Sequence, residues 1–226
     1  IINKFGEIIG WVGGGCVKSI IIKEAEDALQ SGRARLVRIG KTGSSEKSEC
    51  VVEYKMTCQS EGMVEVFIEP VLPQPHLIVI GKSAIAKATV KIAKAAGYRV
   101  TAMAEDIRPD TFEGVDELIT QISFQHVKLT PASAIVVITQ GEKDELALEK
   151  ALEQPCGYVG FVASKKKKTS VLSYLADKDI DAKKIDNIHS PAGIDINAKK
   201  PEEVAISILA EIIVWKNSGV PMPVAE

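Results

Sequence analysis

The sequence predicts an α/β protein in two parts: a small α+β module over residues 1–70, then a Rossmann-like domain over residues 71–226. In the second part a parallel sheet is expected to carry helices on both faces. Strand-like and helix-like patterns alternate there, whereas the first part has one helical pattern and then three strand-like runs. Pro70, Pro73 and Pro75 form a stiff linker between the two parts.

The composition is that of a globular protein and argues against several functional classes. Of 226 residues, 46% are hydrophobic and 26% are charged, and the formal net charge is −2. A net charge this small and negative gives no reason to expect a general binding surface for nucleic acid or membrane. No apolar run approaches the roughly 18 residues of a membrane span. The four cysteines form no C-x-x-C pair or regular framework, so a reducing cytoplasm is the expected location.

The clearest element is a β-α-β unit over residues 75–109. Leu77–Ile80 is a continuous apolar run, which is typical of a strand buried on both faces. From Ile85 onward apolar residues recur three or four positions apart, which predicts a helix with one oily face. Gly97 ends this helix as a C-cap glycine, and Tyr98–Met103 is expected to form the second strand.

The turn after the first of these strands is a candidate binding site for a nucleotide or its phosphate. Gly81 lets backbone approach an anion, the first N–H groups of the helix point at it, and Lys82 could neutralise a phosphate. Ser83, however, stands where the second glycine of a dinucleotide fingerprint would lie. Two hypotheses therefore stay open. Asp106 either accepts from a ribose hydroxyl of a nucleotide-like ligand, or caps a loop beside a turn that is only structural.

A second candidate site is the glycine-cysteine turn, which comprises Gly13, Gly14, Gly15 and Cys16. It lies between a strand expected at Glu7–Val12 and a helix expected over Val17–Gly32. The positive end of a helix favours a thiolate, and the glycines leave backbone donors open to a ligand. The alternative is a tight turn in which Cys16 is a small buried hydrophobe.

The remaining cysteines are weaker candidates. Cys58 lies between two expected strands, and Cys50 and Cys156 are expected to pack against strands. The strands of the first part are expected at Ala34–Ile39, Cys50–Lys55 and Met63–Ile68, with a polar loop at Lys41–Ser48.

Polar residues follow the strands of the second part, and the carboxyl ends of parallel strands meet at one edge of a sheet. Further strands are expected at Glu117–Ile122, which could also be a helix end, and at Ser133–Thr139 and Tyr158–Ala163, with a short helix at Thr111–Gly114. The groups expected to converge are Ser83, Asp106, Arg108, Gln140, Asp144 and the run Ser164, Lys165, Lys166, Lys167 and Lys168. The lysines could hold an anion at a helix start or form a solvated helix face.

No catalytic set is evident. The sequence has no nucleophile elbow, zinc-protease helix or Walker loop, and its three histidines are far apart. His189 is expected in a loop as a bystander. Pro201 opens the last helix, whose stripe of Val204, Ile208, Ile212 and Trp215 predicts core packing. A binding or carrier protein is therefore favoured over an enzyme.

Four stretches resemble the XdhC/CoxI family, the accessory proteins of xanthine dehydrogenase and related molybdenum hydroxylases. They are GWVGGGCVKSIIIKEAEDAL at Gly10–Leu29, HLIVIGKSAIAKATVKIAKAAGYRV at His76–Val100 with EDIRP after it, YVGFVASKKKK at Tyr158–Lys168, and PAGIDINAKKPEEVAISILAEII at Pro191–Ile213. They span nearly the whole chain in the order of the family.

The resemblance implies a protein that binds the molybdenum cofactor and protects it while a cysteine desulfurase supplies the terminal sulfur. The cofactor is then delivered to the apo-enzyme of a molybdenum hydroxylase. Cys16 matches the family's cysteine, which implies a contact with molybdenum or sulfur, and the backbone donors of the glycines suit the pterin's phosphate. Asp106 and Arg108 match the family's acidic-basic pair after the second strand.

The sequence departs from the family pattern at several positions. Relatives read G-x-G-H where this chain has Gly81-Lys82-Ser83-Ala84, and Ser-Arg-Arg where it has Ser164-Lys165-Lys166. The strand and loop that precede Glu7 in relatives are also absent. A separate small subunit or a second protomer is therefore expected to complete the first module, and a homodimer that covers its open sheet edge is the expected assembly.

Two hypotheses from other classes stay open. One is an NAD(P)-dependent oxidoreductase that uses the unit from position 81 to position 106, although Ser83 and the lack of a proton donor argue against it. The other is a nucleotide-sensing regulatory domain that delivers no cofactor.

Overall fold

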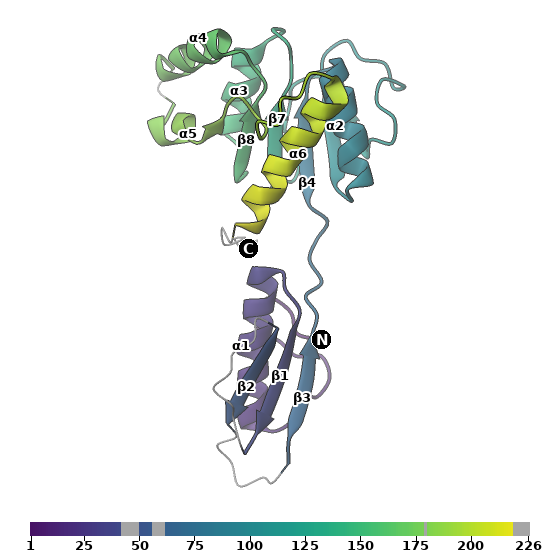
Figure 1. The fold of residues 1–226 in the computed structure, drawn as a ribbon, viewed down its shortest axis with the longest axis vertical. Helices are drawn as coiled ribbons and strands as arrows, with labels where there is room; N and C mark the ends of the chain where they lie inside the picture. The colour runs from purple at the N-terminus through teal and green to yellow at the C-terminus, as the bar shows by residue number, and fades with distance from the viewer. Residues whose placement is uncertain (42–49, 56–61, 179, 219–226) are drawn as a thin grey trace. The chain divides into compact units, whose positions relative to one another are not determined.

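The computed structural model describes residues 1–41, 50–55, 62–178 and 180–218. This part of the chain forms two compact units, one over Ile1–Pro73 and a second that begins at Gln74 (Figure 1). The first contains a mixed three-stranded sheet and the second a six-stranded parallel sheet. The predicted α/β class, with a Rossmann-like domain after a small α+β module, is confirmed.

The second unit is a parallel sheet in the order β6-β5-β4-β7-β8-β9. Its strands are β4 (His76–Ile80), β5 (Arg99–Met103), β6 (Glu117–Ile119), β7 (Ala134–Val137), β8 (Tyr158–Phe161) and β9 (Ile188–His189). From β4 the chain runs outward through β5 to β6 and then returns to place β7 on the other side of β4. The strand order therefore reverses between β4 and β7, which is where ligands bind in open α/β sheets.

Helices cover both faces of this sheet. They are α2 (Ala84–Ala95), α3 (Asp144–Leu152), α4 (Lys165–Ala176), α5 (Ala182–Asp186) and α6 (Pro201–Asn217). All five residues of β4 are buried: Leu77 and Val79 belong to the core under α2 and α6, and Ile78 and Ile80 to the core under α3 and α4. This two-sided burial explains why the strand reads as a continuous apolar run. The predicted stripe of α6 packs into the first of these cores.

The first unit consists of α1 (Gly15–Ser31) on a sheet in the order β2-β1-β3, with β1 at Arg35–Gly40, β2 at Val51–Lys55 and β3 at Val64–Ile68. Val17 and Ile21 of α1 pack against Val37 and Ile39 of β1. Gly32 ends α1 in the left-handed conformation (φ 68°), as predicted. The polar loop at Lys41–Ser48, apart from its first residue, and Cys58 lie outside the described residues.

The prediction of a strand at Glu7–Val12 is wrong. This segment, all of it described, has only an isolated bridge between Ile2 and Ile8. Gly6 (φ 74°) and Gly10 (φ 111°) turn the backbone in conformations that a strand does not contain. The apolar run therefore belongs to a looped segment that precedes α1.

Smaller corrections concern the second unit and Cys50. Thr111–Gly114 is a turn rather than a helix, because four residues are too few to nucleate one and the Thr111 N–H donates to Arg108 O instead (3.0 Å). Only the first three residues of Glu117–Ile122 form a strand. Cys50 precedes β2 and is exposed rather than packed. Among the described helices, none is long and apolar enough to cross a membrane.

His189 lies in β9 rather than in a loop, and it has a structural partner. Its Nδ1 is 3.0 Å from Glu211 Oε1 on α6, while Glu211 Oε2 accepts from the Tyr158 hydroxyl (2.7 Å) and the Gly193 N–H (2.6 Å). Burial alone would raise the pKa of Glu211, but these hydrogen bonds together lower it. This carboxylate therefore ties the loop after β9 to α6.

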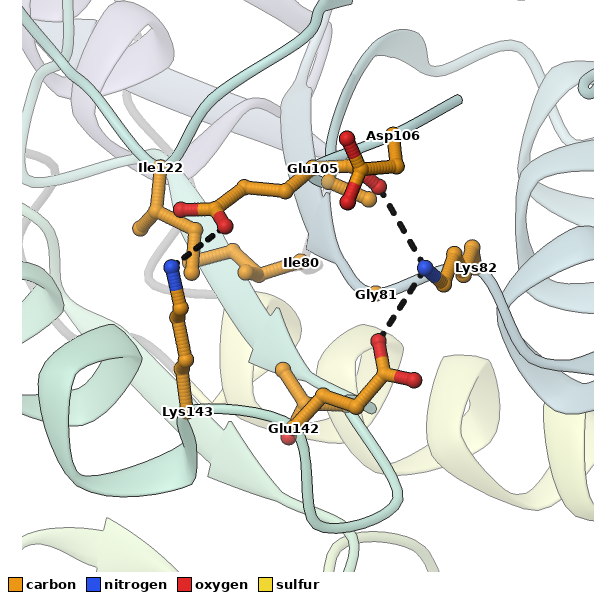
Figure 2. Close-up of a pocket in the computed structure, with 10 residues that line it drawn as sticks. Ile80, Gly81, Lys82, Glu105, Asp106, Ile122, Glu142 and Lys143 are labelled. Atoms are coloured by element: carbon orange, nitrogen blue, oxygen red, sulfur yellow. Dashed lines mark hydrogen bonds and ion pairs between the residues drawn. The ribbon is translucent and has the colours of Figure 1, made fainter. Parts of the chain in front are cut away.

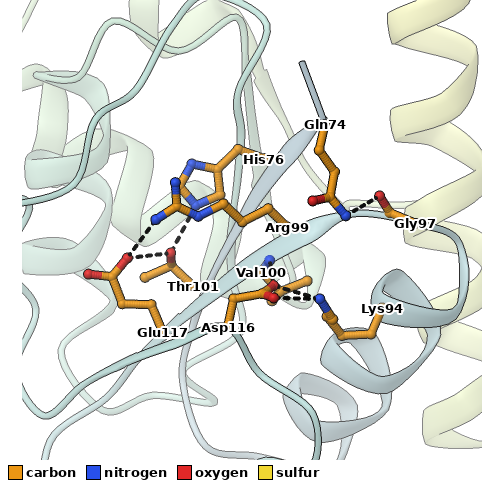
Figure 3. A network of polar contacts seen from close by, with 9 residues as sticks. All are labelled: Gln74, His76, Lys94, Gly97, Arg99, Val100, Thr101, Asp116 and Glu117. Carbon is orange, nitrogen blue, oxygen red and sulfur yellow. Dashed lines mark hydrogen bonds and ion pairs between the residues drawn. The ribbon is translucent and has the colours of Figure 1, made fainter. Parts of the chain in front are cut away.

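A polar network closes the amino end of the sheet (Figure 3). His76 Nε2 lies 2.8 Å from Thr101 Oγ1, and the Thr101 hydroxyl donates to Glu117 Oε2 (3.3 Å). The Arg99 guanidinium donates to the same carboxylate oxygen (3.3 Å). Burial lowers the pKa of His76, and the positive charge of Arg99 lowers it further.

We expect His76 to make the fold sensitive to mild acid. Its folded-state pKa lies below the unfolded value of about 6.5, so its contribution is complete above that pH and is lost as the pH falls through the folded-state pKa. The free energy of unfolding, measured by denaturant titration between pH 7.5 and 5, should fall more steeply for wild type than for His76→Gln. The exposed His126 gives the control His126→Gln, which should keep the wild-type slope. Equal slopes in all three proteins would exclude His76 as the source.

Candidate functional site

The carboxyl ends of β4, β5 and β7 surround a cavity of about 320 Å³ (Figure 2). Its lining comes from Ile80 at the end of β4, from the loops that follow the three strands, and from Ile122. The lining residues are Ile80, Gly81, Lys82, Ala104, Glu105, Asp106, Ile122, Thr139, Glu142 and Lys143. The cavity lies at the reversal of strand order between β4 and β7.

Gly81 has a structural reason to be glycine. Its φ is 129°, and a Cβ at this position would lie 2.3 Å from Ile138 O, which follows β7. The Ser83 hydroxyl accepts from the Ala86 N–H (3.1 Å) as the N-cap of α2 and lies 3.3 Å from Ile138 O, to which it donates. The close approach of two backbone segments therefore explains this turn without a ligand.

Of the five charged residues that line the cavity, four alternate in sign around it, and the fifth is Asp106 (Figure 2). Lys82 Nζ lies 3.1 Å from Glu142 Oε2 and 3.4 Å from the backbone oxygen of Glu105. Lys143 pairs with the Glu105 carboxylate. The four side chains are 37% to 71% exposed, so each pair contributes at most about 1 kcal/mol and can exchange partners readily. We call Glu142, Lys82, Glu105 and Lys143 the charged ring.

Left-handed backbone gathers at the same place. Among the described residues, four other than glycine have a positive φ, and three of them are Asp106 (51°), Gln140 (54°) and Lys143 (62°). Asp106 and Lys143 line the cavity, and Gln140 follows Thr139, which also lines it. Such conformations are costly for these residues and accumulate at functional sites.

The structure brings together three of the residues predicted to bind a ligand in the second unit. Gly81, Lys82 and Asp106 line one cavity, and Ser83 caps the adjacent helix. Arg108 does not line the cavity. Its side chain is 84% exposed and lies 3.3 Å from Asp110.

The lysines that follow β8 have different surroundings: two make contacts within the unit and two are exposed to solvent. Ser164 caps α4 by accepting the Lys167 N–H, and Lys165 and Lys166 are exposed. Lys167 pairs with Asp144, whose side chain is only 2% exposed, and Lys168 donates to the backbone oxygen of Ser190. None of these residues lines the cavity.

The glycine-cysteine turn lies at the start of α1 in the first unit. Gly14 is the N-cap, and as a glycine it makes no side-chain cap. A Cβ at Gly13 would lie 3.2 Å from Val17 Cγ1, but at Gly14 or Gly15 it would meet no described atom within 4 Å. Cys16 is half-buried and packs against the core of the unit. The position next to a helix start is as predicted, and the role of the thiol stays a prediction.

The other described cysteines differ from Cys16 in their surroundings. Burial raises the pKa of the Cys156 thiol to about 11, which makes it unreactive, and Cys50 is exposed before β2. Among the described residues, no three His, Cys, Asp or Glu side chains are grouped so that they could hold a metal ion.

Sequence reasoning missed part of the cavity. Glu105, Glu142 and Lys143 were not among the predicted binding residues, although each follows a strand at its carboxyl end. That position was the available signal. The ion pairs that they form with Lys82 and with each other join three loops that are distant in sequence, so no local sequence pattern could reveal these pairs.

The fold and these two sites define a class of protein: a Rossmann-type domain with a cavity at its strand reversal, joined to a small module with a cysteine in the first turn of its helix. The model of the XdhC Rossmann domain matches residues 77–212, and that of the XdhC and CoxI family matches residues 1–40. Since the first match covers more than half of the chain, this protein belongs to the XdhC/CoxI family.

Two curated proteins are similar to this chain in sequence. The chain is 30% identical to YqeB of Escherichia coli over 229 residues (97% of this chain, 40% of YqeB). It is 29% identical to a Bacillus subtilis protein, named as a probable subunit of xanthine dehydrogenase, over 157 residues (66% of this chain, 45% of that protein). The chain therefore spans less than half the length of these relatives.

A solved structure has a similar fold. The crystal structure of a xanthine dehydrogenase from Bacillus halodurans matches with a TM-score of 0.55 and 23% identity, over 90% of this chain and 65% of that one. At this level of identity, the match supports the fold alone.

The contact between Gly81 and Ile138 predicts a strong effect of a single methyl group. Gly81→Ala should lower the free energy of unfolding by more than about 3 kcal/mol, because the new Cβ meets a backbone oxygen in a left-handed conformation. Gly97→Ala is the control: it also has a positive φ (83°) but open space, so a loss of about 1–2 kcal/mol is expected. Denaturant titration measures both, and equal losses would exclude the close approach as the cause.

The lysine run predicts unequal effects of two neighbouring substitutions. Lys167→Gln leaves the buried Asp144 carboxylate without its cation and should lower the free energy of unfolding by about 1–3 kcal/mol, less than for a fully buried pair because Lys167 is 32% exposed. Lys166→Gln should change it by less than about 0.5 kcal/mol. Thermal or denaturant unfolding distinguishes the two, and similar small effects would mean that all the lysines are solvated.

Proposed function

We propose that this protein is an accessory factor of a molybdenum hydroxylase of the xanthine dehydrogenase type. It binds the molybdenum cofactor, protects it during sulfuration and delivers it to the apo-enzyme. Membership of the XdhC/CoxI family supports this function, as does similarity to a relative named as a probable subunit of xanthine dehydrogenase. Residues 1–70 would handle the cofactor, and residues 71–226 would form the Rossmann domain.

The observation that carries the proposal is the glycine N-cap of α1 directly before Cys16. Serine side chains cap α2 and α4 and accept an N–H of the first turn, whereas the N-cap of α1 is Gly14, which has no side chain. Packing within the described structure does not require glycine at Gly14 or Gly15. The first-turn N–H groups of α1 receive no cap from Gly14, which has no side chain, and N–H groups at a helix start suit an anionic group of a ligand.

The donor set fits the proposed cargo. The N–H groups at the start of α1 suit the phosphate of the pterin. The Cys16 thiolate is a soft donor that suits molybdenum or its sulfur ligand, and the positive end of α1 favours the thiolate form. Cys16 would thus hold the reactive end of the cofactor while the glycines hold its phosphate. Since this role needs a reduced thiol, we place the protein in the cytoplasm.

Exposed apolar side chains before the turn support a protein partner at this site. Ile1, Phe5, Ile9 and Trp11 are between 71% and 89% exposed. Large exposed apolar groups close together in the chain are typical of interaction surfaces. We propose that this segment contacts the apo-hydroxylase or the cysteine desulfurase during transfer, and that a second protomer of a homodimer, or a small subunit, covers it at other times.

Cys16→Ala should abolish a mass shift that wild type gives with purified molybdenum cofactor in anaerobic native mass spectrometry. A decrease of at least tenfold in bound fraction is expected, because the thiolate is the proposed soft ligand. Cys50→Ala removes an exposed thiol of the same unit and should bind as wild type. Full binding by Cys16→Ala, with an unchanged circular dichroism spectrum, would contradict the role of Cys16.

A second variant tests the glycines separately from the thiol. A serine at Gly14 would cap α1 as Ser83 caps α2, so Gly14→Ser should leave stability unchanged or raise it by a few tenths of a kcal/mol. Cofactor binding should nevertheless decrease, because the hydroxyl occupies an N–H donor. Unchanged binding in this variant would place the cofactor elsewhere.

A further inference from the structure

We propose that the cavity in the second unit binds a nucleoside phosphate of mononucleotide size, and that Glu142 competes with its phosphate for Lys82. This site is separate from the glycine-cysteine turn and takes a different ligand. The inference rests on the charged ring, the lining of the cavity and the serine that caps the adjacent helix.

Two amino groups reach the cavity from different loops (Figure 2). Lys82 comes from the loop after β4 and Lys143 from the loop that precedes α3. Their side chains are 37% and 51% exposed, so both can turn towards a ligand. Ammonium groups that converge on one cavity from two directions suit a phosphate group.

The other side of the cavity suits a nucleoside. Asp106 follows β5 and lines the cavity, at the position where a carboxylate accepts from ribose hydroxyls in Rossmann-type domains. Ile80, Ala104 and Ile122 supply apolar lining on which a base can lie. Acceptors for a sugar, an apolar wall and two cations thus line the same cavity.

The size of the cavity and Ser83 limit the ligand. A volume of about 320 Å³ is near the lower end of the range of about 300–1,000 Å³ found for ligand pockets. Ser83 replaces the glycine that lets a pyrophosphate approach the helix, and its hydroxyl already accepts the Ala86 N–H. The lysines, rather than the start of α2, are therefore the phosphate-binding groups, and a dinucleotide should gain nothing over a mononucleotide.

Glu142 makes this site self-inhibited. Its carboxylate lies 3.1 Å from Lys82 Nζ, in the place that a phosphate oxygen would take, and its side chain is 71% exposed. An exposed pair of this kind is weak, so a phosphate with a larger charge can displace it. Removing the carboxylate charge should therefore strengthen phosphate binding, which is the opposite of what loss of a ligand-contacting residue does.

Isothermal titration calorimetry of the full chain with ADP tests the proposal. Glu142→Gln should raise the affinity for ADP by up to about fivefold, the effect expected when one exposed ion pair no longer competes. Lys82→Ala should lower it about tenfold. Lys91 and Glu113 form a more exposed pair of the same unit outside the cavity (3.5 Å), so Lys91→Ala and Glu113→Gln are controls that should bind as wild type.

Three further ligands identify which part of the nucleotide is bound. Adenosine and inorganic phosphate should each bind more weakly than ADP, and NAD no more tightly than ADP. Asp106→Asn should weaken binding of ADP and adenosine but not of inorganic phosphate. No binding of ADP at millimolar concentration, weaker binding by Glu142→Gln, or tighter binding of NAD than of ADP would overturn the inference. If the protein binds the molybdenum cofactor but not ADP, this inference fails and the proposed accessory function stands.

Discussion

At the end of β4 the backbone bonds to both neighbouring strands, and the architecture of the second unit depends on this junction. The Gly81 N–H donates to Met103 O (2.8 Å), and the Ile138 N–H donates to Ile80 O (2.7 Å). The strand order reverses here, with β5 on one side of β4 and β7 on the other. The loops that follow these three strands therefore separate at this place. The cavity is the space that they leave, and only glycine fits the position that brings β4 and β7 this close.

The two candidate sites use the start of a helix in opposite ways. At α2 a serine side chain and a backbone contact occupy the turn. The groups left to select a ligand are therefore the lysines and carboxylates of the loops around the cavity. At α1 the N-cap is Gly14, which has no side chain to cap the helix, and a half-buried cysteine lies in the first turn. A protein that handles a phosphorylated, sulfur-containing cargo and also responds to a nucleotide would need both kinds of site.

Much of the fold could be predicted from the sequence because burial determines it locally. β4, buried on both faces, and α2, apolar on one face, have patterns that other structures rarely imitate. The segment Glu7–Val12 has a similar apolar run but loops, because Gly6 and Gly10 turn its backbone and no strand of the described unit pairs with it. A strand exists only where another strand is available, and a short window of sequence does not contain that information.

By itself the sequence determined the α/β class, the order of most of the elements and the candidate residues Gly81, Lys82, Asp106 and Cys16. Only the tertiary structure decided that Lys82 and Lys143 share one cavity, that Arg108 points to solvent and that Lys167 belongs to the buried Asp144. The reason is physical. Periodicity records which face of an element avoids water, whereas ion pairs between loops depend on distances that exist only after the strands have aligned.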